Sequence, residues 1–356
     1  KIYAGCLGIL AGDFMKQASD SNANMVGVGL LYRYGYFAQE IAVSGEQMAQ
    51  YIPQKFSQLP LNPVRDANGE WVKVSIAFPG RSVYAKVWRV NVGRVGLYLR
   101  DTDFEGNSPD DRAITSRLYG GDSEMRIKPE MFLGVGGIRL LEALGMKPTI
   151  YHCNEGHAAF CGLERLRVYI AKHNLDFDVA LELVRASTLF TTHTPVPAGH
   201  DAFEEHLMRT YMPHYAHRMN ISWERFMGLG RFNPNNPNEK FSMSVLATNL
   251  SQEVNGVSKI HGRVSREMFQ SLWPGYFATE NHIGSVTNGV HLPTWSNRMW
   301  QRLYHETFGV NFIDNQSDEK VWEQIYGVPD AKIWDLRKQL KHELMAYLSV
   351  KLKEDM

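Results

Sequence analysis

The alternation of strand-like and helix-like segments after about residue 126 constrains the fold of this chain most strongly. Apolar residues recur at helical spacing in 138–144, 160–170 and 178–187, and short strand-like runs occupy 148–153 and 189–193. Helices that alternate with strands in this way indicate βαβ units around a parallel sheet. The sequence therefore predicts an α/β fold.

A second pattern, of period two, occupies residues 71–99. Apolar residues alternate with polar or small ones there, and the breaks are Pro79-Gly80 and Asn91-Val92-Gly93, which predicts a meander of three antiparallel strands. The acidic segment 101–112 is typical of a solvated loop. We also expect a helix after the glycine-rich turn at 5–8, a buried strand at 26–32, and an amphipathic helix after Pro329, with Ile333, Leu336, Leu340, Leu344 and Leu348 on one stripe.

Length and charge exclude several classes of protein. A chain of 356 residues corresponds to about two domains. Its formal net charge is zero, so it lacks the basic surplus of a nucleic-acid-binding protein, and no apolar run approaches the ~20 residues of a membrane span. Three cysteines form no disulfide framework, which favours a reducing cytoplasm. The first residues resemble no signal peptide, and both ends of the sequence look cut.

Three loops are candidates for chemistry, because ligands of open α/β sheets bind beyond the carboxyl ends of the strands. They are 154–157, 193–200 and 287–291, each with histidine or asparagine at a turn. A single such loop is more often a helix cap or a satisfied histidine, but three in one α/β region indicate a site. The glycine turn at 5–8 opens a helix and could bind phosphate through its N–H groups.

Other chemistries fit less well. His152 and His157 are five residues apart, whereas a helical zinc site needs four, and no serine-hydrolase elbow occurs. The carboxylates in 101–111 are more typical of a solvated loop than of a glycosidase pair. We therefore expect no metal site.

Several motifs resemble, in order, those of the α-glucan (glycogen and maltodextrin) phosphorylase family, in its shorter bacterial and archaeal branch. They are Gly5–Asp13, Gly27–Phe37, Arg117–Asp122, His152–Ala158, Thr192–Pro195, Val254–His261 and Val286–Val290. The resemblance covers roughly residues 3–310. It implies a glycosyltransferase of the GT-B type, whose N-terminal Rossmann-like domain carries an inserted β-meander. Residues 1–285 would form that domain, clipped at its start, and 286–356 the first part of a truncated second domain.

The implied reaction is the reversible phosphorolysis of α-1,4-glucan by inorganic phosphate to glucose 1-phosphate, with pyridoxal 5′-phosphate as cofactor. The resemblance places the cofactor's lysine beyond Met356, so we expect no catalytic side chain in this chain and no phosphorolysis by it alone. The substrate-binding residues that it implies are Leu7, Asp122, Glu155, His157, His193 and Asn288. Gly5 and Cys6 would lie near the phosphates, although Cys6 stands where the family usually has glycine.

Two alternatives remain open at this point. A nucleotide-sugar glucosyltransferase of the glycogen-synthase type shares the architecture and a similar glycine loop, but its Lys-x-Gly-Gly pattern is only half met, since Lys1 is too far from Gly5. A non-catalytic glucan-binding module is the third interpretation. Glucan and phosphate are the expected partners, nucleic acid and membrane are not, and a homodimer is one possible assembly.

Overall fold

The structure is a computed structural model that describes residues 7–118, 121–196 and 199–354. The chain forms two compact units. One comprises the described residues of Lys1–Ser19 and Ala23–Gly289, and the other those of Asp20–Asn22 and Val290–Met356. In the described segments, no helix combines the length and the apolar character needed to cross a membrane.

The first sheet of the larger unit contains the predicted meander. Strands β5 (Lys73–Phe78), β6 (Arg81–Val92) and β7 (Val95–Asp101) pair antiparallel, so that prediction is confirmed. Their turns contain Gly80 and Gly93, which both have positive φ, a conformation that glycine adopts without strain. The meander belongs to a larger five-stranded sheet, because β1 (Val26–Leu30) adds parallel to β7 and β4 (Asn62–Pro63) adds antiparallel to β6.

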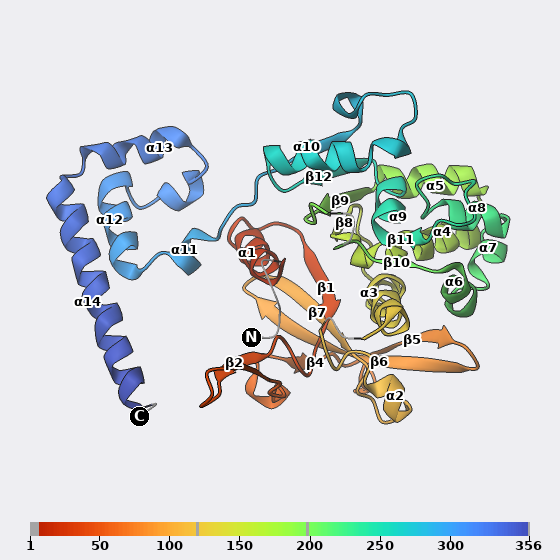
Figure 1. Cartoon of the computed structure of the whole chain (residues 1–356), viewed down its shortest axis with the longest axis horizontal. Helices are drawn as coiled ribbons and strands as arrows, with labels where there is room; N and C mark the ends of the chain where they lie inside the picture. Colours follow the sequence, from red (N-terminus) through yellow and green to blue (C-terminus); the bar gives the residue numbers. More distant parts are fainter. Residues whose placement is uncertain (1–6, 119–120, 197–198, 355–356) are drawn as a thin grey trace. The chain divides into compact units, whose positions relative to one another are not determined.

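The second sheet is fully parallel and has the order β13-β12-β9-β8. Its strands are β8 (Tyr151–Asn154), β9 (Thr188–Thr192), β12 (Glu253–Gly256) and β13 (Ile283–Ser285). Helices α4 (Phe160–His173) and α5 (Phe177–Ala186) connect β8 to β9, and α10 (Lys259–Met268) connects β12 to β13. The α/β prediction is therefore confirmed for this part of the chain (Figure 1).

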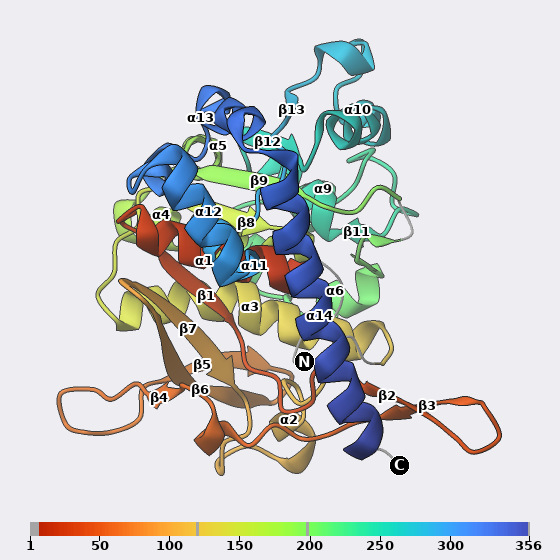
Figure 2. The same cartoon turned by 90° about the vertical axis from the view of Figure 1, so that its left-hand side faces the viewer.

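Helix α3 (Ser123–Ala143) is shared by the two sheets. It packs against β1 and β5 of the first sheet and against α4, which covers the second (Figures 1 and 2). Glycines allow both approaches: a Cβ on Gly134 would lie 2.7 Å from the backbone nitrogen of Cys161 in α4, and one on Gly137 would lie 3.0 Å from Nη1 of Arg100 in β7. The fully buried guanidinium of Arg100 also donates to the carbonyl of Gly29 in β1.

The remaining elements of the larger unit are shorter. Helix α1 (Leu7–Asp20) begins where a helix was expected, and Phe14 on it meets His152 of β8 edge to face, with ring centroids 6.0 Å apart. The others are the hairpin β2 (Ala38–Ile41) and β3 (Gln47–Gln50), the pair β10 (Ala202–Phe203) and β11 (Phe241–Ser242), and α2 (Pro109–Arg112), α6 (Glu205–Tyr211), α7 (Tyr215–Arg218), α8 (Trp223–Gly228) and α9 (Met243–Asn249), with short 3-10 turns including η2 (Gly156–Ala158).

The acidic segment 101–112 forms the predicted loop over residues 102–108, but two of its carboxylates are buried, contrary to the expectation of a solvated segment. Asp101 ends β7 with 2% of its surface exposed and lies 3.5 Å from Nζ of Lys86. Asp111 is equally buried in α2, where Nε of Arg81 donates to it over 2.7 Å. Both carboxylates can be buried because cations of β6, which are far from them in the sequence, form ion pairs with them. The local sequence does not reveal these partners.

The smaller unit is helical in the residues described. It contains α11 (Leu292–Trp295), α12 (Arg298–Phe308), α13 (Glu319–Glu323) and α14 (Asp330–Glu354). Aromatic rings of α12, α13 and the turn between them pack together, with Trp322 5.2 Å from Phe308 between centroids. The helix predicted after Pro329 is confirmed as α14. Its apolar stripe is half-buried at Ile333, Leu336 and Leu340 and exposed at Leu344 and Leu348.

Candidate functional site

The candidate site lies at the carboxyl edge of the parallel sheet. Because β8, β9, β12 and β13 run in one direction, the loops that follow them meet at that edge. The turn after β8 carries Glu155 and His157, and the loop after β9 carries His193. The loop after β13 is joined to that after β12 by the backbone N–H of Asn288, which donates to the carbonyl of Val257 over 3.1 Å.

Glu155 holds two of these loops together. One carboxylate oxygen accepts from the backbone N–H of His193 over 2.9 Å and from the hydroxyl of Thr194 over 3.0 Å, and the other accepts from the N–H of Gly156. Only 4% of the residue is exposed. Its backbone has φ 70° and ψ 171°, a region that is almost exclusive to glycine. For any other residue this conformation costs about 1–3 kcal/mol. Glu155 is thus a strained, buried anchor of the His193 loop.

His193 offers unused hydrogen-bonding capacity at this edge. Both of its ring nitrogens are buried and have no partner among the described residues, and the same holds for the hydroxyl of Thr192 beside it. Burial lowers the pKa of His193, so the imidazole is neutral near pH 7 and presents one donor and one acceptor. Buried polar atoms without partners are rare, and a ligand with hydroxyl groups would satisfy them.

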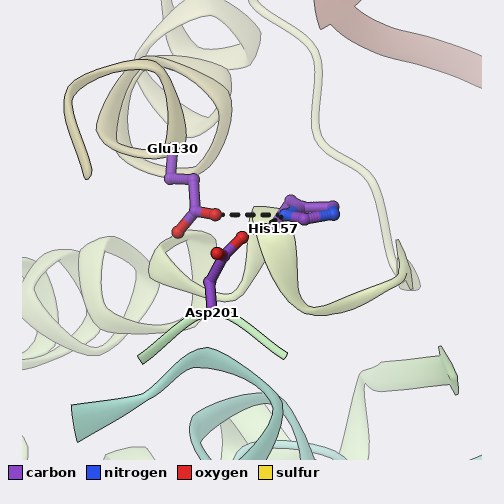
Figure 3. A group of neighbouring side chains, drawn as sticks. All are labelled: Glu130, His157 and Asp201. Carbon is purple, nitrogen blue, oxygen red and sulfur yellow. Dashed lines mark hydrogen bonds and ion pairs between the residues drawn. The ribbon is translucent and has the colours of Figure 1, made fainter. Parts of the chain in front are cut away.

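His157 lies between two buried carboxylates, as Figure 3 shows. Its Nδ1 lies 3.0 Å from Oε1 of Glu130 on α3 and 3.0 Å from Oδ2 of Asp201, which precedes β10. Arg126 pairs with the same aspartate. Nitrogen and oxygen atoms of Glu130, His157 and Asp201 lie within 4.8 Å of one another, a spacing that could hold a metal ion. The guanidinium of Arg126, which pairs with Asp201, already supplies the cluster with a positive charge.

The pKa values of this cluster favour an ion pair. Burial raises the pKa of Glu130 to about 8, so this carboxyl is largely protonated at neutral pH. Burial opposes the charge on His157, but hydrogen bonds with Asp201 and Glu130 raise its pKa to about 10. Asp201 is also desolvated, yet its bonds with His157 and Glu130 lower its pKa to about 2. At pH 7 the cluster is therefore an imidazolium–aspartate pair beside a neutral carboxyl group.

Glu130→Gln is expected to flatten the pH dependence of stability. A raised carboxyl pKa contributes stability below the unfolded value of about 4.3, and this contribution is lost as the pH rises through about 8. The free energy of unfolding of the unmodified chain should therefore fall between pH 5 and 8 by about 1 kcal/mol or more beyond that of the variant. Urea unfolding at several pH values measures this. Glu142→Gln, on the half-exposed end of the same helix, should keep the original slope, and equal slopes for all three proteins would refute the assignment.

A further chain of hydrogen bonds crosses the sheet and was not predicted from the sequence. The amide of Asn255 on β12 donates to the Gly256 carbonyl, and its oxygen accepts from the hydroxyl of Thr191 on β9 over 3.0 Å. That hydroxyl therefore accepts from Nε2 of His152 on β8, 2.8 Å away, which fixes the proton of the imidazole on Nε2. One polar row thus aligns three strands.

The structure places the other predicted residues less centrally. Leu7 begins α1 and is half-buried. Asp122 is the exposed N-cap of α3, accepting from the N–H of Met125 over 2.9 Å, and Asn288 is exposed. Gly5 and Cys6 lie outside the described residues. Glu130 and Asp201 were missed, although a single carboxyl in the apolar run of α3 is a signal that could have pointed to Glu130.

The comparisons with known proteins agree with the motifs. A profile described as carbohydrate phosphorylase matches residues 141–355. Glycogen phosphorylase of Mycobacterium tuberculosis is 42% identical over 99% of this chain and 42% of its own length. Maltodextrin phosphorylase of Thermococcus litoralis is 39% identical over the same shares, and glycogen phosphorylase of Aquifex aeolicus is 36% identical over 99% of this chain and 50% of its own length.

The chain thus spans about two-fifths to one-half of the length of these relatives. Its mixed α/β architecture fits a glycosyltransferase of the GT-B kind. The profile match covers more than half of the chain, and it includes the β8 turn and the β9 loop that form the candidate site. This chain belongs to the carbohydrate phosphorylase family.

Proposed function

We propose that the protein to which this chain belongs catalyses the reversible phosphorolysis of α-1,4-glucan to glucose 1-phosphate. The match to glycogen and maltodextrin phosphorylases along 99% of the chain carries this proposal. The buried, neutral and unpartnered imidazole of His193 supports it, because sugar hydroxyls need paired donors and acceptors rather than charges. Residues 1–285 would form the glucan-binding domain of the GT-B fold, and residues 286–356 would begin the second domain.

Within the site, each residue has a distinct proposed role. His193 binds a glucosyl hydroxyl, Glu155 holds its loop, and the His157 imidazolium orders the turn after β8. Leu7, Asp122 and Asn288 are proposed as outer contacts to the glucan, and Gly5 and Cys6 as neighbours of phosphate. The homodimer and the cytoplasmic location stay predictions.

Pyridoxal phosphate is the cofactor expected of this family, and when bound it supplies a phosphate group for proton transfer. Its attachment requires a lysine amine. The described residues gathered at the carboxyl edge are carboxylates, imidazoles, hydroxyls and amides: Glu130, His152, Glu155, His157, Thr191, Thr192, His193, Asp201 and Asn255. This set contains no lysine and so does not fit the attachment of pyridoxal phosphate through its aldehyde group. We therefore derive no step through the cofactor from these residues.

The reaction is tested with the full-length protein. Incubation with maltodextrin and inorganic phosphate should release glucose 1-phosphate, measured by a coupled enzymatic assay. Incubation with maltodextrin and a nucleotide-activated glucose should not lengthen the glucan. Chain extension from the nucleotide sugar would favour a synthase-type transferase, and glucan binding without either reaction would favour a binding module.

Glu155→Gln in the full-length protein is expected to lower kcat/KM for glucan about ten- to a hundred-fold. The carboxylate accepts from His193, Thr194 and Gly156 through two oxygens, whereas the amide has only one oxygen. At least one of these donors would therefore face the NH₂ group and lose its acceptor. Hydrogen bonds to a charged group contribute about 1.5–3 kcal/mol, which corresponds to this range. Thr194→Val removes only one hydroxyl donor and should have a smaller effect. Unchanged kinetics for Glu155→Gln would show that the His193 loop does not need this anchor.

A further inference from the structure

Two cysteines meet beside the candidate site without forming a bond. Cys153 lies in β8 on the face opposite His152, and Cys161 lies in the first turn of α4. Their sulfur atoms are 3.5 Å apart, and both are free thiols. A disulfide bond needs about 2.05 Å, so an approach of about 1.5 Å separates this pair from a covalent link.

The two thiols differ in access. Cys153 has 3% of its surface exposed, whereas Cys161 is half-buried. Arg165 follows Cys161 by one helical turn, and its guanidinium is fixed over the ring of Tyr151 at 3.7 Å and bonded to Thr188. A fixed cation near a partly accessible thiol is the environment in which cysteines become reactive.

The charges near the pair point the same way. The contact with Cys153 lowers the pKa of Cys161; burial opposes this effect, and the charge of Arg165 adds to it. The same contact raises the pKa of Cys153, and so does burial. Cys161 is therefore the thiol of the pair that ionises more readily.

We propose that Cys161 is an oxidation site for peroxides and that Cys153 resolves the oxidised sulfur to a reversible disulfide between α4 and β8. A more accessible thiol that reacts first and a more buried neighbour that resolves it form the usual pair in thiol redox chemistry. This inference does not depend on the proposed glucan reaction.

The chemistry balances with hydrogen peroxide as the oxidant. The Cys161 thiolate attacks one peroxide oxygen, the O–O bond breaks, and the leaving hydroxide takes a proton to become water. The resulting sulfenic acid is attacked by the sulfur of Cys153, whose proton leaves with the departing hydroxyl as a second water. Two thiols are oxidised to one disulfide, and one peroxide is reduced to two waters.

The position of the link gives it a consequence for the site. The ring closed by the disulfide runs from residue 153 to residue 161 and contains both Glu155 and His157. Closing it draws the end of β8 toward the start of α4, whose backbone nitrogen at Cys161 already lies close to Gly134.

The test uses the whole chain with Cys6→Ser, which removes the third cysteine. The protein is treated with graded hydrogen peroxide, alkylated under denaturing conditions, digested without reductant and analysed by mass spectrometry. We expect one cross-linked species joining the peptides of Cys153 and Cys161, lighter by two hydrogens than the two free peptides, which dithiothreitol reverses. Two alkylated thiols after peroxide treatment, or a sulfonic acid at Cys161 beside a free Cys153, would overturn the proposal.

Two variants test the order of the steps. With Cys153→Ser, Cys161 should be trapped as a sulfenic acid by a cyclic diketone, and no cross-link should form. With Cys161→Ser, Cys153 should stay alkylatable at the same peroxide concentration. Faster oxidation of Cys153 in Cys161→Ser than of Cys161 in Cys153→Ser would contradict the assigned roles. Circular dichroism before treatment identifies any variant that is not folded. In that case the cross-linking result for the Cys6→Ser protein, which keeps both Cys153 and Cys161, decides the question.

Discussion

Replacing Glu164 with alanine is expected to lower the free energy of unfolding by about 3–5 kcal/mol. The side chain of Glu164 in α4 is fully buried. It accepts from Nε of Arg139 over 2.9 Å, from Nη2 of Arg167 over 2.9 Å and from the hydroxyl of Tyr215 over 2.6 Å. Without the carboxylate, two guanidinium groups and a phenol lose their acceptor at once, so the loss exceeds that of a surface ion pair.

This carboxylate also links elements that are distant in sequence. Arg139 lies on α3 and donates in addition to the carbonyl of Ser75 in β5 over 2.7 Å, and Tyr215 begins α7. Burial works against the charge of Glu164, but the bond from Arg167 and the charge of Arg139 lower its pKa below the usual range. The stability that it contributes is therefore present above the unfolded carboxyl pKa and is lost as the pH falls through the lowered value.

The measurement is urea unfolding at pH 7, followed by circular dichroism. Glu182→Ala is the matched control, because Glu182 forms an exposed pair with Arg185 in the neighbouring helix α5, over 3.1 Å. Such pairs contribute between 0 and about 1 kcal/mol. Glu164→Gln, which keeps the volume and one acceptor, should fall between the two. A loss for Glu164→Ala no larger than that of Glu182→Ala would rule out the network as a source of stability.

Gly134→Ala is expected to destabilise the chain by about 1–3 kcal/mol, although alanine is the better helix former. The added Cβ would lie 2.7 Å from both the backbone nitrogen of Cys161 and the Cβ of Phe160. Backbone atoms of α4 cannot turn away as a flexible side chain could. The two helices would therefore have to separate, and the buried contacts between them would weaken.

Gly136→Ala in the same helix provides the comparison. Its Cβ would meet Nη1 of Arg100 at 3.5 Å and Cδ1 of Ile76 at 3.6 Å, which are ordinary contact distances. Helix propensity then dominates, and the variant should gain up to about 1 kcal/mol. Thermal unfolding of both variants measures the difference, and it would contradict the close packing of α3 on α4 if Gly134→Ala were also stabilising.

The features that the sequence predicted correctly rest on local signals. Pro79-Gly80 and Gly93 interrupt a period-two pattern, and the meander turns at those residues. Gly145 follows the last apolar residue of a helical pattern and has positive φ just beyond the end of α3. Turn-forming residues and hydrophobic periodicity act over a few neighbouring positions, so the local sequence contains everything that determines these features.

The features that could not be predicted from the sequence depend on partners far along the chain. Asp111 is buried because Arg81 meets it, and Glu155 is buried because the N–H of a residue 38 positions later donates to it. The sequence indicated Glu155 and His157 through the family's motif, but not that the former is an anchor or that the latter is charged by its neighbours on α3 and before β10. Separations of this kind are set by the topology, and no spacing rule encodes them.

The shared position of α3 has a consequence for how the larger unit unfolds. Helix α3 packs on β1 and β5 of the first sheet and on α4, so it cannot detach from either side without exposing the apolar side chains that it buries there. The two sheets should therefore open as one cooperative unit, and the slowest-exchanging amides of β6 and of β9 should report the same opening free energy in native-state hydrogen exchange. The meander, despite its self-contained strand pairing, is then no independently stable subdomain but one half of a single folding unit.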